Sequence, residues 1–110
     1  MKDSYTEKRA SLRIPTNITV RFSCENLLHT VFYGTVANIS EKGMLITTDT
    51  CFSKNTDIRL FMYKGKILLV NATVKRVVKV NGRDEAMGIE VAHPDPEYAA
   101  FVNDLKASTA

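Results

Sequence analysis

Two arginines, Arg9 and Arg13, lie four residues apart in a charged segment at the start of the 110-residue chain. Because four residues make about one helical turn and four is also an even number, the two side chains share a face whether the segment is helical or extended. A planar guanidinium pairs in bidentate fashion with phosphate oxygens or with guanine O6 and N7, and it stacks on flat rings. The pair suits a ligand that carries phosphates and bases. A solvated tail without a partner fits the same spacing.

A second polar cluster, Asn38 and Ser40, interrupts an apolar stretch just before Gly43. If this stretch is a regular strand, Asn38 and Ser40 share the outer face with Val36, while Ile39 points into the core. The short amide and hydroxyl groups then offer donors and acceptors with little rotamer entropy to lose. Asn, Ser and Gly are also the residue types of ordinary turns. The pattern alone leaves both interpretations open.

The remaining reactive side chains show no arrangement typical of an enzyme. His29 and His93 are isolated, and Cys24 and Cys51 are widely separated with no CxxC spacing. No triad or paired carboxylate is apparent in the sequence. We therefore expect no catalytic residue, no metal and no cofactor.

The composition is that of one ordinary globular domain, with 45% apolar and 25% charged residues and a net charge of +3. This mild positive charge suits a small anionic partner and falls short of a nucleic-acid-binding surface. The N-terminus has no apolar region of the secretory type, and the apolar runs are too short to cross a bilayer. We expect a cytoplasmic protein without membrane contact, either a monomer or a weak dimer.

The elements that must position the polar residues are predominantly strands. Residues 17–22 alternate with a period of two, which places Ile18, Val20 and Phe22 on one face. Strands of the same kind are expected at 30–40, 44–49, 57–63, 66–80 and 85–91. Many short strands joined by turns predict an all-β antiparallel barrel or sandwich.

The longest expected strand, residues 66–80, ends in a clear turn signal. Asn81-Gly82 predicts a tight hairpin to the next strand. Strict alternation places five small apolar residues on one face of this strand: Val70, Ala72, Val74, Val78 and Val80.

The two ends of the chain differ from the strand region. Residues 1–15 are polar and charged, so we expect a flexible tail that Pro15 closes, with the folded domain at 16–110. Asp95 can cap a helix with Pro96 at its first position. An apolar repeat then predicts an amphipathic helix over about 95–107, formed by Tyr98, Phe101, Val102 and Leu105. It is either a lid on the strands or a docking helix.

The order of the two polar motifs resembles the PilZ domain family. The family pattern RxxxR followed by [D/N]xSxxG is matched by Arg9, Arg13, Asn38, Ser40 and Gly43. The segment MGIEV at 87–91 is similar to the closing strand of the family, and a helix after the barrel is also usual. The resemblance implies a six-stranded antiparallel β-barrel with an N-terminal tail and a C-terminal helix, and a receptor for the bacterial second messenger cyclic di-GMP.

The resemblance also implies roles for the individual residues. Arg9 and Arg13 would grip guanine edges and phosphates, Asn38 would bind a guanine, and Ser40 would contact a phosphate or the neighbouring base. Gly43 would hold the turn where a side chain would clash. Separately, Arg76 would pack on a base. The family often has Asp at the position of Asn38, and an amide offers one uncharged acceptor in its place.

The mechanism that follows is a tail that orders over the ligand and signals to a downstream protein. Ordering the tail costs roughly 2–5 kcal/mol, and bidentate contacts of about 1–3 kcal/mol each offset this cost. Two alternatives remain: a PilZ-like adaptor that acts only through protein contacts, and a small barrel that binds single-stranded nucleic acid.

Overall fold

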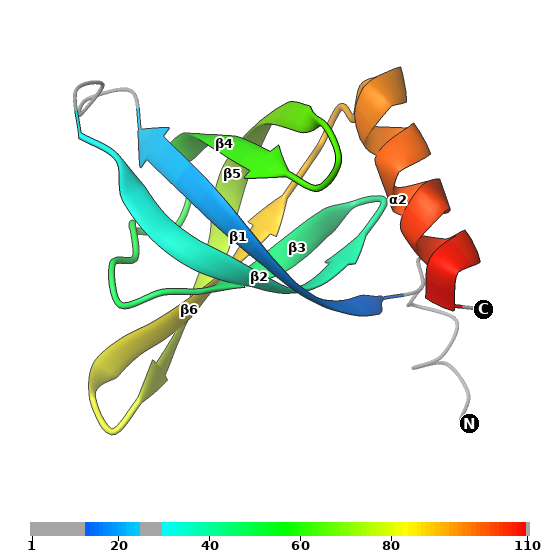
Figure 1. Cartoon of the computed structure of the whole chain (residues 1–110). Helices are drawn as coiled ribbons and strands as arrows, with labels where there is room; N and C mark the ends of the chain where they lie inside the picture. The colour runs from blue at the N-terminus through cyan, green and yellow to red at the C-terminus, as the bar shows by residue number, and fades with distance from the viewer. Residues whose placement is uncertain (1–12, 25–29, 110) are drawn as a thin grey trace, which may run out of the picture.

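The computed structural model describes residues 13–24 and 30–109 of the chain. Six antiparallel strands close into a barrel in the order β1-β2-β3-β6-β5-β4, followed by one helix (Figure 1). The strands are β1 (Ile14–Cys24), β2 (Phe32–Ser40), β3 (Gly43–Thr47), β4 (Asp57–Tyr63), β5 (Ile67–Val80) and β6 (Arg83–Glu90). The expected six-stranded antiparallel barrel is therefore confirmed. Arg9 and most of the predicted tail lie outside the described residues.

Alternating apolar residues fill the barrel, as the period of two requires. In β1 the side chains of Ile18, Val20 and Phe22 are buried, while Thr19 and Arg21 between them are exposed. The strand begins at Ile14, slightly before the predicted boundary at residue 16. Ile14 is buried and pairs with Ile39, so residues 14 and 15 belong to the barrel.

A β-bulge in β2 changes which of its residues face the core. In the pairing of β2 with β3, Val36 opposes Ile46 and Asn38 opposes Leu45. The strand β2 therefore advances by two residues where β3 advances by one. Val36 and Ile39 are both fully buried although they are three residues apart, and Asn38 between them is half-exposed. The expectation that Val36 shares the outer face was wrong, because the extra residue of a bulge breaks strict alternation.

Similar irregularities in β5 separate its two halves. Val74 is buried and pairs with Ile89, but two residues later Arg76 pairs with Gly88 and is exposed. A second shift in the pairing lies between Val78 and Lys79, where the extra residue belongs to β6, between Asp84 and Ala86. Val80 is 50% exposed whereas Val70, Ala72 and Val74 are buried, so the prediction that Val80 shares one face with them was wrong for the same reason.

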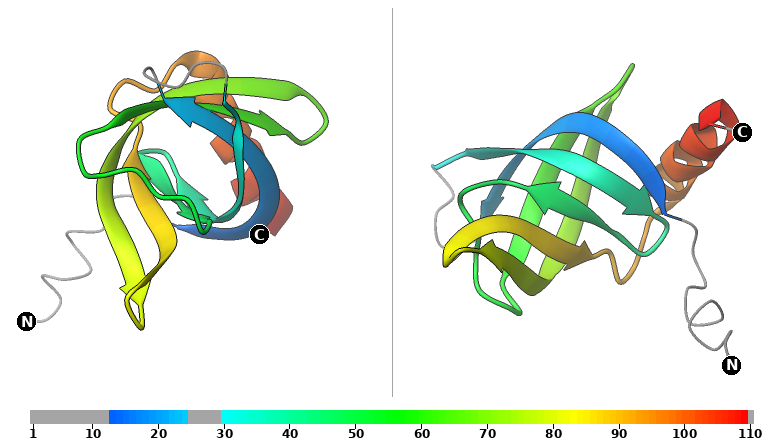
Figure 2. Two further views of the ribbon diagram at one scale, coloured as in Figure 1. Left: turned by 90° about the vertical axis from the view of Figure 1, so that its left-hand side faces the viewer. Right: turned by 90° about the horizontal axis from the view of Figure 1, so that it is seen from below.

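The helix α2 (Pro96–Thr109) covers one end of the barrel, as the left view of Figure 2 shows. The Asp95 carboxylate accepts a hydrogen bond from the backbone N–H of Tyr98 at 2.9 Å, which confirms the predicted N-cap. The four apolar residues of the predicted stripe are buried in the barrel core: Tyr98, Phe101, Val102 and Leu105. The helix therefore acts as a lid on the barrel.

The opposite end of the barrel is filled by aromatic rings. Phe22, Phe32 and Phe52 contact one another with ring centroids 5.3 to 6.0 Å apart. The hairpin between β5 and β6 turns at Asn81 and Gly82, both with positive φ, as predicted for this pair. In the described part of the chain no helix is long and apolar enough to cross a membrane.

Candidate ligand-binding site

A hollow of about 380 Å³ lies on the outer surface of the barrel beside Asn38. Its lining residues are Arg13, Pro15, Ala37, Asn38, Leu45 and Arg76. Successive strand partners build it: Pro15 opposes Asn38, Asn38 opposes Leu45, Leu45 opposes Gly88, and Gly88 opposes Arg76. The floor of the hollow is therefore one lateral row of residues across five strands.

The β2 bulge aims Asn38 into this hollow. Residues two apart in a regular strand share a face, and Val36 is buried. Without the extra residue, Asn38 would therefore lie on the core face. Asn38 instead accepts a hydrogen bond on Oδ1 from Nη1 of Arg13 at 2.7 Å. The structure thus brings together one residue of each predicted motif, 25 positions apart in the sequence.

The β5 bulge aims Arg76 at the same hollow from the other side. Gly88, directly opposite, leaves space for the long side chain: a Cβ at this position would lie 2.7 Å from Nε of Arg76. Arg76 therefore lies across the backbone of β6 at Gly88. Its flat guanidinium borders the hollow opposite the Arg13–Asn38 pair.

Ser40 and Gly43 form the turn between β2 and β3 and do not line the hollow. Ser40 is 2% exposed, and its Oγ accepts a hydrogen bond from the backbone N–H of Lys42 at 3.2 Å. A Cβ at Gly43 would lie 2.1 Å from the backbone oxygen of Ile89, so only glycine permits this close approach of β3 and β6. The [D/N]xSxxG pattern thus combines one surface residue with two residues that shape the turn.

A hydrogen bond and an ion pair connect helix α2 to this turn. The hydroxyl of Tyr98 donates to the backbone oxygen of Ser40 at 2.7 Å, and Lys106 pairs with Glu41 at 2.9 Å. Burial raises the pKa of the Tyr98 hydroxyl well above its usual range, and the nearby positive charge of Arg13 offsets this only in part. The hydroxyl therefore remains a donor at all physiological pH values, and the position of α2 is tied to the turn that follows Asn38.

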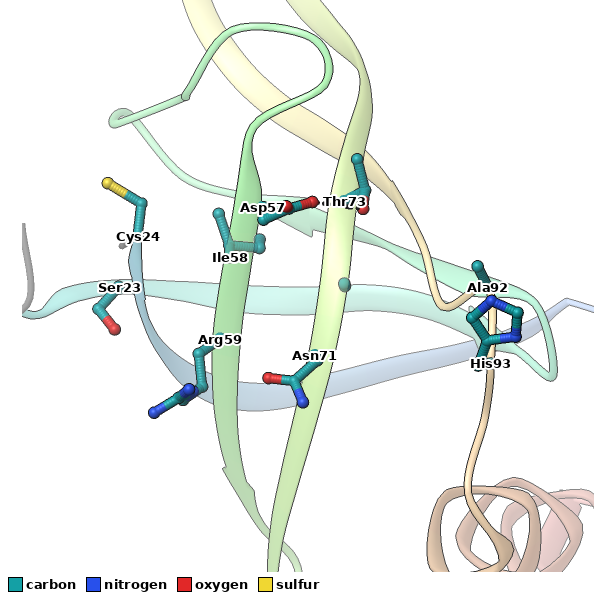
Figure 3. A pocket seen from close by; sticks show the side chains of 10 residues that line it. Ser23, Cys24, Asp57, Ile58, Arg59, Asn71, Thr73, Ala92 and His93 are labelled. Carbon is teal, nitrogen blue, oxygen red and sulfur yellow. Dashed lines mark hydrogen bonds between the residues drawn. The ribbon is translucent and has the colours of Figure 1, made fainter. Parts of the chain in front are cut away.

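A larger hollow of about 520 Å³ lies along β1, β4 and β5 (Figure 3). Its polar lining includes Arg59, Asn71 and His93, and Asp57 accepts a hydrogen bond from Oγ1 of Thr73 at 2.9 Å. None of the predicted site residues lines it. Across the residues that the structure describes, no three His, Cys, Asp or Glu side chains are grouped as metal ligands.

Sequence reasoning identified Arg13 and Asn38 but missed how the site is completed. Pro15 and Leu45 join the lining because of strand pairing, which period and composition do not specify. Arg76 was indicated only by the resemblance. The signal for it was Gly88 within the closing strand, because a glycine in a strand interior often marks a close approach of another group.

A closed six-stranded barrel with a helical lid and a basic, amide-lined hollow on its outer wall defines the class of this protein as a small lidded β-barrel with a candidate ligand-binding site. The PilZ domain family model matches residues 7–107, nearly the whole chain. The chain belongs to the PilZ domain family. The search of curated proteins found no match.

Several solved structures share this fold. The Bacillus subtilis inhibitor of motility, MotI/DgrA, aligns with a TM-score of 0.73 and 15% identity over 92% of this chain, which spans only 51% of that protein. The PilZ domain of YcgR from Escherichia coli, solved with c-di-GMP, aligns with a TM-score of 0.73 and 10% identity over 93% of this chain and 94% of that one. The PilZ domain of CeSA from a cellulose-synthesizing bacterium aligns at 0.63 with 19% identity, over 87% and 99%.

Proposed function

We propose that this protein is a non-enzymatic receptor for cyclic di-GMP and that the hollow beside Asn38 is its binding site. The observation that carries the proposal is the convergence of Arg13, Asn38 and Arg76 on one concave surface. Membership of the PilZ family and the likeness to the YcgR domain, which was solved with this ligand, support it.

The three side chains offer what such a ligand requires. Cyclic di-GMP carries two phosphates and two guanines, and a guanidinium can pair with a phosphate or with the guanine edge in bidentate fashion. The amide of Asn38 supplies both an acceptor and a donor at the guanine edge. Arg76 presents a flat cationic surface on which a base can stack.

The ligand also connects the hollow to the N-terminal segment. Arg9 and Arg13 belong to one motif, and Arg13 is already hydrogen-bonded to Asn38. In our proposal, residues 1–12 fold over the bound ligand, Arg9 contacts it, and the rearranged surface is read by a downstream protein in the cytoplasm. Ser40 and Gly43 contribute by holding the turn, and Ser40 reaches the ligand only if that turn opens.

The decisive experiment is calorimetric titration of cyclic di-GMP into the wild type and three arginine variants. Arg13→Ala and Arg13→Lys should both weaken binding by about tenfold or more, because a lysine keeps the charge but not the bidentate geometry. Arg83→Ala removes an exposed arginine from the β5–β6 hairpin, away from the hollow, and should bind like the wild type. GMP serves as the ligand control.

Asn38→Ala is the complementary variant and should also lose about tenfold in affinity. No saturable binding to a folded wild type would reject the receptor proposal and favour the adaptor that acts through protein contacts alone. Equal losses in Arg83→Ala and Arg13→Ala would show that only net charge matters. Retention of RNA or DNA at low salt, without preference for guanine, would favour the nucleic-acid barrel.

A further inference from the structure

Large apolar side chains are exposed together on the outer wall of the barrel, away from the hollow. Tyr33 is 62% exposed, Tyr63 67%, Ile67 72% and Leu69 47%, and Phe61 between them is half-buried. Large apolar side chains that are exposed next to one another mark interaction surfaces in small monomeric proteins.

Strand pairing shows that these side chains are neighbours. Tyr33 opposes Arg21, Arg21 opposes Phe61, and Phe61 opposes Leu69. Directly opposed residues of antiparallel strands lie on the same face of the sheet, so the four form a row across β2, β1, β4 and β5. We call this surface, completed by the next opposed pair of β4 and β5, the Phe61 face: Arg21, Tyr33, Phe61, Leu69, Tyr63 and Ile67.

The β4–β5 hairpin carries part of the Phe61 face beyond the rest of the barrel. Both views of Figure 2 show this hairpin extending outward. Its tip contains Lys64 and Lys66 on either side of Gly65, all exposed, and Tyr63 opposes Ile67 next to them. The tip therefore presents an aromatic ring, an aliphatic side chain and two cations together.

The charged side chains within the Phe61 face and at the β4–β5 tip are all positive, and the nearest carboxylate on that side of β4, Asp57, lies beyond Arg59 and accepts a hydrogen bond from Thr73. Arg21 lies within it, Arg59 lies next to Phe61 on the same side of β4, and the two lysines lie at the tip. Figure 3 shows Arg59 beside its strand partner Asn71. Strands β1 and β2 and residues 58–72 contain no Asp or Glu. A partner that is acidic as well as apolar therefore complements this surface.

Arg21 lies over the ring of its strand partner Phe61. Its guanidinium carbon lies 5.6 Å from the centroid of the Phe61 ring, within cation–π distance. A guanidinium stacked on a ring keeps its N–H donors, whose planar fork fits a carboxylate. A carboxylate opposite Arg21, with apolar side chains on both sides of it, matches the row.

We infer that the Phe61 face is the docking surface for an acidic, apolar segment of a partner protein. A bilayer fits this surface less well, because inserting Tyr33 and Phe61 would carry the charged Arg21 between them into the acyl region. A protein segment avoids that penalty by placing a carboxylate against Arg21.

The Phe61 face is separate from the ligand hollow and extends the proposed function. On β1, Pro15 lines the hollow and Arg21 belongs to the face, six residues apart, which is about 20 Å along a strand. The partner protein and the ligand can therefore bind at the same time, and a substitution can abolish the binding of one without affecting the binding of the other.

The test is an NMR titration of the full ¹⁵N-labelled chain with a synthetic amphipathic peptide that has glutamates on one side and leucines and phenylalanines on the other. Saturable shifts are expected at Arg21, Tyr33, Phe61 and Leu69. Leu69→Ser and Arg21→Glu should each weaken peptide binding by about tenfold.

Two matched variants lie elsewhere and should bind the peptide like the wild type. Val80→Ser removes a similarly exposed apolar residue of the same strand, 50% exposed against 47% for Leu69. Arg83→Glu makes the same charge change on the β5–β6 hairpin. A peptide with lysines in place of the glutamates should produce no shifts at the Phe61 face.

Three results would overturn the inference. The peptide could leave the Phe61 face unshifted, anionic phosphatidylserine vesicles could perturb it where the peptide does not, or its signals could move with protein concentration as in self-association. Cyclic di-GMP added to the same samples tests the receptor proposal separately. Leu69→Ser should keep ligand-induced shifts at Asn38, and their absence in the wild type would reject only the ligand proposal.

Discussion

Arg13 and Asn38 already satisfy each other through a 2.7 Å hydrogen bond. A ligand that enters the hollow must exchange this bond for its own contacts, so the net gain is smaller than the sum of the new hydrogen bonds. The exchange favours ligands that offer both an anionic acceptor for the arginine and a donor for the amide oxygen. A simple anion satisfies only the first requirement.

Gly43→Ala should destabilise the fold by about 2–4 kcal/mol, because its Cβ would lie 2.1 Å from the Ile89 backbone oxygen. The strand pair β3–β6 would have to separate, since a backbone atom cannot rotate away. Urea unfolding followed by circular dichroism measures the change. A variant as stable as the wild type would mean that the β2–β3 turn is far more plastic than its packing indicates.

Gly88→Ala should leave the fold nearly intact and weaken ligand binding. Here the added Cβ would lie 2.7 Å from Nε and 3.0 Å from Cγ of Arg76, which are atoms of a flexible side chain that can change rotamer. We expect a stability change of about 1 kcal/mol or less and a roughly fivefold loss of affinity for cyclic di-GMP, since Arg76 leaves the hollow. Calorimetry and thermal unfolding of the same preparation compare the two effects. A stability loss as large as that of Gly43→Ala would contradict this account.

The individual elements show which features a sequence specifies locally. The β4 strand was predicted with its observed bounds, and the Asp95 cap and the Asn81-Gly82 turn were confirmed, because alternation, capping and turn chemistry act over a few residues. The bulges at Val36–Asn38 and Val74–Arg76 were missed. A bulge is set by the pairing partner, so a rule that assumes strict alternation assigns the wrong face beyond it.

The link between α2 and the β2–β3 turn depends on one buried hydroxyl. Tyr98→Phe removes the donor to the backbone oxygen of Ser40 and should reduce the free energy of unfolding by about 1–3 kcal/mol near neutral pH. Urea denaturation measures the loss. Ser108→Ala, at the exposed end of the same helix, is the control and should change stability little.

The same substitution should alter the alkaline pH dependence. The pKa of Tyr98 is raised in the folded protein. The stability that this hydroxyl contributes is therefore fully present below the unfolded pKa of about 10. It is lost as pH rises above that value, because only the unfolded chain then releases the proton. Wild-type stability should therefore fall more steeply above this pH than that of Tyr98→Phe. Parallel curves for the two proteins would show that the hydroxyl is not buried in solution.

At the scale of the whole molecule, barrel and helix share one core. Phe101 and Val102 of α2 pack in the same buried cluster as residues of every strand. Phe101→Ala should therefore lower the stability of the entire domain by about 3–5 kcal/mol, and not merely release the helix. Circular dichroism and tyrosine fluorescence should report a single coincident transition. Loss of helical signal before the barrel unfolds would show two separate units.

The row of residues beneath the hollow comes from five different strands, and this links occupancy to folding by mass action. An unfolded chain cannot place Pro15, Asn38, Leu45, Gly88 and Arg76 side by side, so a ligand held there binds the native state alone. At a free concentration of a hundred times its Kd, such a ligand adds about 2.7 kcal/mol to the free energy of unfolding. The melting temperature then rises with ligand concentration, and the fraction of unfolded chain open to proteolysis falls.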